Sequence, residues 1–333
     1  MMKKIGIIGG GNWGTALAVV LAKQGHAVKL WAYEKEVVES INRIHENCLF
    51  LESYEIPENV VATDSIETAV QGAEIVIGVM PSHHARRLYT QIIPLLRDGT
   101  VFVSATKGIE EDSLERMSQV FAAVAQGRAG VRFAALSGPT FAREIARGDP
   151  AAVVIASQHA EAAEMVQKEF SSRQLRLYRN SDLVGVELGG SVKNVIAIAA
   201  GVCDGLGLGS NSIAALITRG LAEMTRLVVA SGGKRETMAG LAGLGDLVLT
   251  CTGSLSRNRT VGTELGQGKK LAEIMSGTRM VAEGVRTTQA TLSLARKMQV
   301  EMPIVEQMHA LLYEDRTPMQ AIHQLMDRSL KPE

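Results

Sequence analysis

A glycine-rich turn close to the N-terminus constrains the fold of this chain more than any other feature. Lys4–Ile8 is a short, apolar, β-branched run that leads into Gly9-Gly10-Gly11-Asn12-Trp13-Gly14. Thr15–Lys23 is rich in alanine and leucine and ends near Gly25, as a helix with a glycine stop does. The pattern predicts a buried parallel strand, a tight turn and a helix, in that order.

The spacing of Gly9, Gly11 and Gly14 indicates what this turn binds. In dinucleotide-binding proteins the first glycine permits the turn, the second lets the backbone approach the pyrophosphate, and the third lets helix and strand pack closely. The helix N-terminus then offers free N–H groups and the positive end of its dipole. The spacing alone is a weak signal, but here it follows a predicted strand and opens a predicted helix. We therefore predict a dinucleotide site, the alternative being a turn without a ligand.

The two halves of the chain differ in pattern. Further strand-like runs occur in the first half, with helical segments between several of them, at Val28–Trp31, Ile75–Val79, Val101–Ser104, Phe133–Leu136 and Ala152–Ala156. From about Leu188 onward we find helical patterns only, at Val192–Val202, Ile213–Ala230, Leu271–Ser276, Thr287–Met298 and Met302–Tyr313. We expect an α/β protein: a doubly wound, parallel, Rossmann-type sheet in residues 1–187 and an all-α substrate and catalytic domain in residues 188–333.

Composition excludes several classes of function. The 333 residues are 46% hydrophobic, enough for two cores, and 35 basic residues balance 35 acidic ones. Such a chain has no global attraction for nucleic acid or anionic membranes. The apolar stretch after Met1-Met2-Lys3-Lys4 is too short for a signal peptide, and no run of about 18 apolar residues predicts membrane insertion.

Cysteine and histidine usage points to a metal-free cytoplasmic protein. Cys48, Cys203 and Cys251 are far apart and lack metal-ligand spacing, so we expect free thiols in a reducing compartment. His83-His84 is not a metal motif, because adjacent histidines of a regular element do not face one ion. We predict cytoplasmic location and no metal site.

Glu34 bears on the choice of cofactor. It lies about 20 residues beyond the glycine turn, just after the strand Val28–Trp31, where a carboxylate binds the ribose 2′-hydroxyl of NAD and repels the 2′-phosphate of NADP. Tyr33 is placed to stack on adenine, and Lys35 is adjacent. We expect NADH to be accepted at least as well as NADPH; the alternative is that Glu34 is a solvated charge at a helix start.

Lys193 is the most informative polar residue of the second half. It lies in Glu187-Leu188-Gly189-Gly190-Ser191-Val192-Lys193-Asn194, where an almost wholly apolar helix begins, and such a lysine must be buried, paired or facing a cleft unless it reaches solvent. Desolvation lowers the pKa of an ammonium group, which suits it for general acid–base work. Gly189-Gly190 would let a ligand approach beside it.

Two further segments follow strands of the predicted sheet, where ligands bind in wound folds. Ser104-Ala105-Thr106-Lys107-Gly108 places Lys107 to meet an anionic or carbonyl oxygen, although a surface lysine is the alternative. Gly138-Pro139-Thr140-Phe141-Ala142 offers backbone N–H groups and the Thr140 hydroxyl, although an ordinary Gly-Pro turn reads the same way.

The stretch from Gly243 to Arg259 is predicted to be a glycine-broken loop suited to a phosphate dianion. Arg257 supplies a charge-assisted fork, and Ser256 and Asn258 supply neutral donors. Asp246 is placed to orient Lys193 or to bind a substrate hydroxyl. A polar surface loop that caps a helix is the alternative.

Six segments together resemble the bacterial NAD(P)-dependent sn-glycerol-3-phosphate dehydrogenases over nearly the whole chain. They occur in the family's order, at Gly9–Leu17, Ser104–Glu110, Ser137–Glu144, Glu187–Val195, Gly243–Gly262 and Met280–Thr288. The resemblance implies an oxidoreductase that reduces dihydroxyacetone phosphate to sn-glycerol 3-phosphate with NADH or NADPH, at the entry to glycerophospholipid biosynthesis.

The resemblance also assigns roles by motif. Lys193 corresponds to the family's proton donor and acceptor. The substrate contacts it implies are Lys107, Gly138, Thr140, Lys193, Asp246, Ser256, Arg257 and Asn258. The cofactor contacts, together with the glycines of the turn and Glu34, are Asn12, Trp13, Tyr33, Lys107, Ala142, Arg257, Val281 and Glu283. Asn12 and Thr140 stand where serine is common in the family, and the Tyr33-Glu34 region varies within it.

Two other functions remain open at this point. A 3-hydroxyacid or 6-phosphogluconate dehydrogenase has the same two-domain plan and also uses a lysine of its second domain. A cofactor-binding redox sensor without catalysis would need neither Lys193 nor Lys107 and leaves the Arg257 segment unexplained. We expect the apolar surface of the helical half to support a homodimer.

Overall fold

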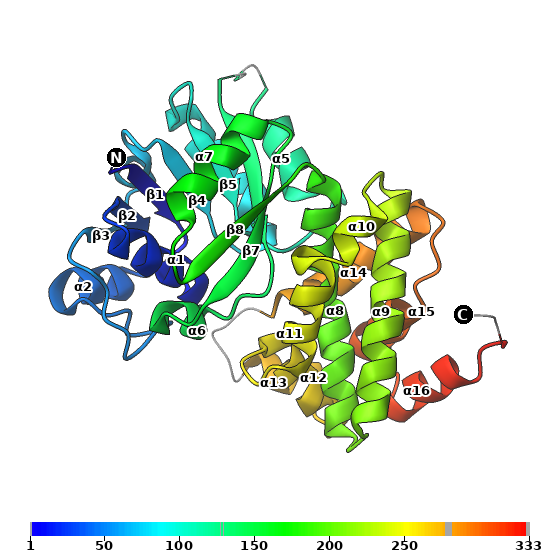
Figure 1. Ribbon diagram of the computed structural model, residues 1–333. Coiled ribbons are helices and arrows are strands. Elements are labelled where there is room, and N and C mark those ends of the chain that lie inside the picture. Colours follow the sequence, from blue (N-terminus) through cyan, green and yellow to red (C-terminus); the bar gives the residue numbers. More distant parts are fainter. Residues whose placement is uncertain (1, 127, 129, 277–281, 331–333) are drawn as a thin grey trace.

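The computed structural model of the chain describes residues 2–126, 128, 130–276 and 282–330. Figure 1 shows a sheet covered by helices in the first half and a bundle of helices in the second. The strands are β1 (Lys4–Ile8), β2 (Ala27–Trp31), β3 (Val60–Thr63), β4 (Ile75–Gly78), β5 (Val101–Ser104), β6 (Arg132–Ser137), β7 (Ala151–Ala156) and β8 (Leu175–Asn180). The predicted α/β class with a helical second half is confirmed.

The strands form one sheet in the order β3-β2-β1-β4-β5-β6-β7-β8. The chain order reverses between β1 and β4, where Ile7 pairs with Leu30 on one side and with Ile77 on the other. Such a reversal leaves a crevice at the carboxyl ends of the strands, and the glycine turn after β1 lies at this crevice.

The expectation of an entirely parallel sheet is wrong at one position. β7 runs antiparallel to β6, with Leu136 opposite Ile155, and β8 is parallel to β7. The chain between β6 and β7 forms the short helix α6 (Ala142–Arg147), which packs against α1 (Asn12–Lys23) near the carboxyl edge of the sheet. Because the connection does not cross the face of the sheet, the chain re-enters from the same edge and the next strand is antiparallel.

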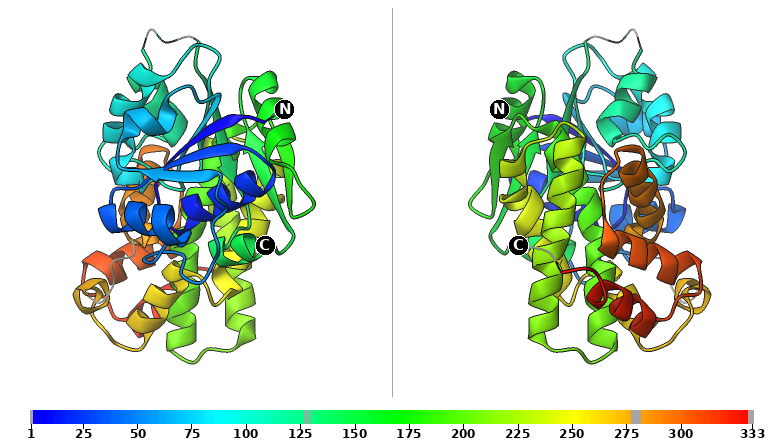
Figure 2. Two further views of the ribbon diagram at one scale, coloured as in Figure 1. Left: turned by 90° about the vertical axis from the view of Figure 1, so that its left-hand side faces the viewer. Right: turned by 90° about the vertical axis from the view of Figure 1, so that its right-hand side faces the viewer.

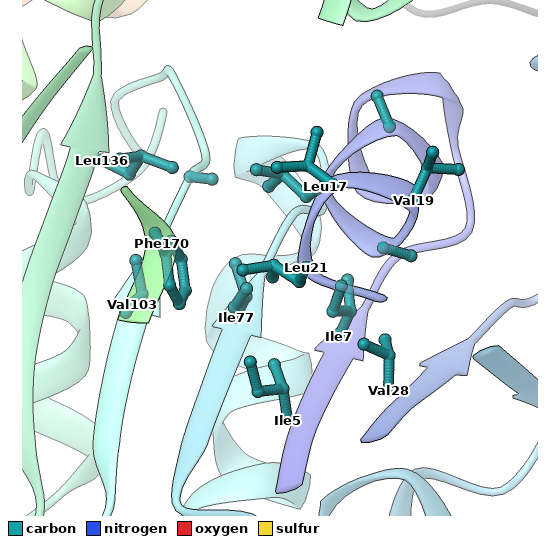
Figure 3. Close-up of a cluster of buried hydrophobic side chains, with 14 of the residues drawn as sticks. Ile5, Ile7, Leu17, Val19, Leu21, Val28, Ile77, Val103, Leu136 and Phe170 are labelled. Carbon is teal, nitrogen blue, oxygen red and sulfur yellow. The ribbon is translucent and has the colours of Figure 1, made fainter. Parts of the chain in front are cut away.

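Helices cover both faces of the sheet. The remaining helices of this half are α2 (Lys35–Ile44), α3 (Ile66–Val70), η1 (Ser82–His84), α4 (Ala85–Ile92), η2 (Ile93–Leu95), α5 (Met117–Val124) and α7 (Ala160–Phe170). On one face α1, α2 and α7 bury their apolar sides, and Leu17 and Leu21 of α1 lie over Ile7 and Ile77 (Figure 3). On the other face α3, α4 and α5 form a second core with Tyr89 and Phe102. This burial anchors the turn between β1 and α1.

The second half is built around one central helix. Its helices are α8 (Leu183–Gly205), α9 (Ser210–Ala230), α10 (Arg235–Met238), a π-helical turn η3 (Leu241–Gly245), α11 (Asp246–Thr252), α12 (Arg257–Gly266), α13 (Leu271–Ser276), α14 (Glu283–Lys297), α15 (Pro303–Tyr313) and α16 (Pro318–Met326). Figure 2 shows α8 beside α9, and α8 also contacts α11, α12, α14 and α15. α8 is long and apolar enough to cross a membrane. However, 89% of its most apolar stretch is buried inside the protein, as in the core helix of a helical domain.

The position of α8 bears on the predicted domain boundary. The side chain of Asp182 caps α8 by accepting a hydrogen bond from the Gly185 N–H at 2.9 Å. Asp182 also accepts from the Lys234 N–H at 2.8 Å and the Thr237 hydroxyl at 2.6 Å. The division between residues 187 and 188 therefore falls inside α8, and it stays a prediction.

A close crossing holds α12 against α8. A Cβ atom on Gly201 of α8 would overlap the carbonyl oxygen of Arg259, and one on Gly262 of α12 would overlap the carbonyl oxygen of Ile198. Only glycine permits this approach, which allows the backbones of the two helices to touch. The crossing brings the start of α12 beside the middle of α8.

Candidate active site

The turn after β1 has the geometry that its glycine spacing predicts. Gly9 has φ +129°, a conformation that side chains disfavour, and a Cβ atom on Gly14 would overlap the carbonyl oxygen of Gly9. Gly11 differs, because a Cβ atom there would meet no described atom within 4 Å. Gly9 and Gly14 are thus required by the backbone, and Gly11 leaves open space above the start of α1.

The first turn of α1 suits an anion. It contains no acidic residue, and Asn12 Oδ1 accepts a hydrogen bond from the Trp13 N–H at 3.1 Å. Within the described chain the buried Trp13 Nε1 has no hydrogen-bond partner. A helix N-terminus below open space is a site for a pyrophosphate, and the residues present therefore fit a dinucleotide.

We predict that Gly11→Ala and Gly14→Ala act on different properties. Gly11→Ala should fold normally, but its methyl group fills the open space, so the Kd for NADH should rise about tenfold or more. Gly14→Ala should lose about 1–3 kcal/mol of stability because backbone must move. Fluorescence titration with NADH and thermal unfolding separate the two effects, and an unchanged Kd in Gly11→Ala would contradict this picture of the turn.

The chain after β2 leaves Glu34 and Tyr33 accessible at the same edge of the sheet. Glu34 occupies the N-cap position of α2, yet its carboxylate makes no capping hydrogen bond within the described structure. Tyr33 is 76% exposed. Both side chains are thus free to meet the adenosine half of a cofactor, and that role stays a prediction.

Lys193, Lys107 and Asp246 meet in one buried cluster. Lys193 Nζ donates to Asp246 Oδ1 and to the Thr250 hydroxyl, the latter at 2.6 Å. Lys107 Nζ donates to Asp246 Oδ2 at 2.7 Å and to the Gly138 carbonyl oxygen at 2.9 Å. Asp246 is completely buried, and it joins the lysine of the sheet half to the lysine of the helical half.

Burial shifts the pKa values of two groups in and beside this cluster. It lowers the pKa of Lys193 to about 8; the charge of Lys107 acts in the same direction, and Asp246 opposes it. Burial also raises the pKa of the neighbouring Cys251 thiol to about 12, so that this cysteine stays neutral. Lys193 is therefore the group of this cluster suited to exchange a proton near neutral pH.

The segment predicted to be a phosphate-binding loop is largely helical, so the prediction of a loop is wrong. Only Gly253–Ser256 separates α11 from α12, and the Ser256 hydroxyl caps α12 by accepting from the Arg259 N–H at 3.3 Å. Glycines and hydroxyl residues have low helix propensity, so the sequence does not indicate these helices. Burial in the tertiary structure overrides that low propensity. α12 nevertheless packs against α8, the helix that carries Lys193.

Ser256, Arg257 and Asn258 differ in how their side chains are engaged. Asn258 donates to Asn194 Oδ1 at 3.0 Å and accepts from the Gly284 N–H at 2.9 Å. Arg257 Nη2 is buried and has no hydrogen-bond partner in the described part of the chain. Of the three predicted phosphate donors, only Arg257 has a buried side-chain atom without any hydrogen-bond partner in the described structure. The substrate contacts of all three residues stay predictions.

The other predicted residues differ in the contacts that they make. The Thr140 hydroxyl donates to the Gly138 carbonyl at 3.2 Å, and Ala142 begins α6. Glu283, at the start of α14, accepts from the N–H and the hydroxyl of Ser82 at 3.0 and 2.8 Å. Glu283 thus connects the helical half to the start of η1, the segment that follows β4, and Val281 lies outside the described residues.

Our interpretation of Gly189-Gly190 as space for a ligand is wrong. A Cβ atom on Gly190 would overlap the Ser137 hydroxyl of β6, and one on Gly189 would lie 2.6 Å from the Ala242 carbonyl oxygen. These glycines let α8 pack against the sheet and η3. Their role is to bring the two halves together.

Sequence reasoning missed Thr250, Asn194 and Ser82 as parts of the site. Thr250 lies four residues after Asp246, one helical turn away, and it donates to the Asp246 carbonyl oxygen at 2.7 Å. A helical interpretation of this segment would have placed both residues on one face. The contacts of Asn194 and Ser82 cross between elements and have no local signal.

Comparisons with known proteins show which family this chain resembles along its length. Residues 4–163 match the model described as NAD-dependent glycerol-3-phosphate dehydrogenase N-terminus, and residues 182–323 match the corresponding C-terminus model. A protein of Koribacter versatilis named glycerol-3-phosphate dehydrogenase [NAD(P)+] is 61% identical over 98% of both chains. One of the same name from Geobacter sp. strain M21 is 53% identical over 100% of this chain and 99% of that protein.

A solved structure shares the whole architecture. The crystal structure of glycerol-3-phosphate dehydrogenase from Coxiella burnetii superposes with a TM-score of 0.93 at 42% identity. The match covers 98% of this chain and 99% of that one. The two-part fold is thus shared with this enzyme.

Proposed function

The chain belongs to the NAD-dependent glycerol-3-phosphate dehydrogenase family, and from this premise we propose that it reduces dihydroxyacetone phosphate reversibly to sn-glycerol 3-phosphate with NADH or NADPH. The product feeds glycerophospholipid biosynthesis. One observation supports this most strongly: a buried lysine with a pKa of about 8 shares Asp246 with a second lysine, and α12, which packs against the helix of that lysine, begins with an arginine whose buried Nη2 is unpaired in the described structure.

The residues of the chain divide the work of the reaction. The open turn at Gly11, Glu34 and Tyr33 hold the cofactor, which supplies the hydride when bound. Lys193 gives its proton to the oxygen of the substrate carbonyl as that oxygen becomes an alkoxide, and in the reverse direction it takes the proton back. The positive charge of Lys107 stabilises the developing oxyanion.

Arg257 carries the specificity for a phosphorylated ketone. Its buried, unpaired Nη2 is satisfied by a phosphate oxygen, and a guanidinium is suited to such an anion. Fixing the phosphate away from the reacting carbon orients the carbonyl toward Lys193. Asp246 holds both ammonium groups in position and keeps the charge of the cluster low.

A spectrophotometric assay at 340 nm tests the function directly. Dihydroxyacetone phosphate should be reduced with NADH and with NADPH, whereas a β-keto acid should not. Reduction of the β-keto acid alone would favour the hydroxyacid or 6-phosphogluconate dehydrogenase alternative. Binding of NADH with no turnover of either substrate would favour a redox sensor.

We predict that kcat/KM with NADH at least equals that with NADPH, because the Glu34 carboxylate repels a 2′-phosphate. Glu34→Gln should raise the ratio of NADPH to NADH efficiency about threefold to tenfold, since it removes one nearby like charge. Glu36→Gln, on an exposed residue in the first turn of α2, is the matched control and should leave the ratio unchanged. A strong NADPH preference of the wild type would contradict the prediction.

We further propose a cytoplasmic homodimer that binds no nucleic acid and does not insert into a membrane. Cys48, Cys203 and Cys251 all lie in the described part of the chain and are free thiols, as expected in a reducing compartment. Leu244 and Val248 are 37% and 40% exposed on the outside of η3 and α11, where they offer apolar surface to a second copy.

A further inference from the structure

The buried guanidinium of Arg257 has no acidic partner among the described residues. Its Nη2 is buried and, among the described residues, without a hydrogen-bond acceptor, although the next arginine, Arg259, pairs with Asp204. Burial lowers the pKa of Arg257, because the charged guanidinium has lost water without gaining an acidic partner. A buried unpaired charge of this kind costs free energy until an anion reaches it.

A second arginine reaches the same place from the sheet half. Arg143 lies in the first turn of α6, two residues after Phe141. The ring of Phe141 packs against Gly253, just before α12, so the start of α6 touches the chain that leads to Arg257. The charge of Arg143 contributes to lowering the pKa of Arg257, which places the two guanidinium groups within electrostatic range of each other.

The side chain of Arg143 is also available to bind a ligand. Its side chain is exposed, and within the described ranges it forms neither an ion pair nor a hydrogen bond. Arg147, one turn further along α6, instead pairs with Asp149. Two like charges on separate halves, with no acidic residue pairing with either in the described structure, repel each other unless an anion lies between them.

We propose that Arg143 is a second phosphate ligand, so that Arg143 from the sheet half and Arg257 from the helical half close on one phosphate group. This rests on the function proposed above, and it deepens it by naming a residue of the sheet half that selects phosphorylated ligands. Because the two arginines come from different halves, the phosphate is held by charge-assisted hydrogen bonds from both halves.

Two ligands of the proposed reaction carry a phosphate oxyanion, the substrate and the cofactor. α6 packs against α1, whose start is the predicted pyrophosphate site, and Arg257 lies beside Asn258 and Asn194 on the substrate side. α6, which carries Arg143, contacts α1, and Phe141 just before it contacts the chain that leads to α12. The shared chemistry is a phosphate oxyanion, and kinetics distinguish the two sources.

The test compares Arg143→Ala and Arg143→Lys with Arg147→Ala, an exposed arginine of the same helix. If the substrate phosphate is the ligand, Arg143→Ala raises KM for dihydroxyacetone phosphate about 5- to 20-fold, as expected for a lost charge-assisted hydrogen bond at an exposed site. It then leaves the efficiency with unphosphorylated dihydroxyacetone unchanged. If the cofactor is the ligand, the Kd for NADH in fluorescence titration rises instead.

Further controls define the result. Arg143→Lys should restore part of the affinity that Arg143→Ala loses. Added salt should reduce the difference in KM or Kd between wild type and Arg143→Ala, because the Arg143 side chain is exposed and its charge is screened. Calorimetric titration with inorganic phosphate measures anion binding without turnover, and Arg143→Ala should bind it more weakly than Arg147→Ala.

The outcomes separate this inference from the proposed function. If Arg143→Ala matches Arg147→Ala in KM, in the Kd for NADH and in phosphate binding, the role of Arg143 is overturned while the function stands. If the wild type does not reduce dihydroxyacetone phosphate, the function fails, and the phosphate and NADH titrations still decide whether Arg143 binds the anion.

Discussion

Replacing Lys193 by methionine is expected to lower kcat for reduction of dihydroxyacetone phosphate by about 10²–10⁴-fold, the usual contribution of a positioned general acid. Methionine fills a similar volume, so the buried site keeps its packing, and Asp246 keeps Lys107 as its partner. The Kd for NADH should change little. Stopped-flow measurement of NADH oxidation together with fluorescence titration of NADH tests both statements.

The pH dependence adds a second readout of the same residue. Lys193 has its pKa lowered to about 8, so it is protonated below and neutral above that pH. Reduction needs the ammonium form, and kcat/KM for the ketone should fall as the pH rises through about 8. Oxidation of sn-glycerol 3-phosphate needs the neutral amine, and its kcat/KM should fall as the pH drops through the same value. Both inflections should disappear in Lys193→Met.

A lysine outside the cluster provides the control for these measurements. Lys297 is exposed in the last turn of α14, and Lys297→Met should keep the wild-type kcat and pH profile. If Lys193→Met kept a near-normal kcat, or if its pH inflections persisted, another group would be the proton donor and the assignment of Lys193 would fail.

Replacing Asp246 by asparagine is expected to damage both stability and catalysis. The neutral amide leaves Lys107 and Lys193 close together without the carboxylate that both of them bind. Breaking a buried ion pair by removing one partner costs about 3–5 kcal/mol, and Tm should fall by several degrees. The loss should be smaller at high pH, because Lys193 sheds its proton there and the repulsion disappears.

The catalytic effect of Asp246→Asn follows from the same charges. Asp246 raises the pKa of Lys193 against the effect of burial, so its removal should move the inflection in kcat/KM to below pH 8. Less of the ammonium form is then present at neutral pH, and kcat for reduction falls. Matched pH profiles of wild type and variant measure the shift.

Asp204→Asn is the matched control for Asp246. Asp204 forms an ion pair with Arg259 in the same helical half, but its side chain is 26% exposed, so its loss should cost less than that of the fully buried Asp246. It should leave the pH inflection in place. An Asp246→Asn variant with the wild-type Tm and inflection would show that the carboxylate does not set the charge state of the two lysines.

Much of the fold was predictable because the signals are local. The β1–α1 unit follows from an apolar run, three spaced glycines and an alanine-rich helix, and these act over a few residues. β8 was not predicted because its exposed positions carry Arg176, Tyr178 and Arg179, which break the apolar pattern of a buried strand. α11 and α12 were not predicted because glycine and hydroxyl residues obscure the helical period.

The sequence by itself determined that this chain binds a dinucleotide and carries a lysine inside an apolar helix. The tertiary structure decided what that lysine does. Asp246 meets Lys193 across 53 positions of the chain and Lys107 across 139, so neither contact leaves a local pattern. Both contacts depend on how α8, α11 and the end of β5 pack together. The charge state of Lys193 is set by burial and by these partners, and burial and partners are properties of the assembled fold.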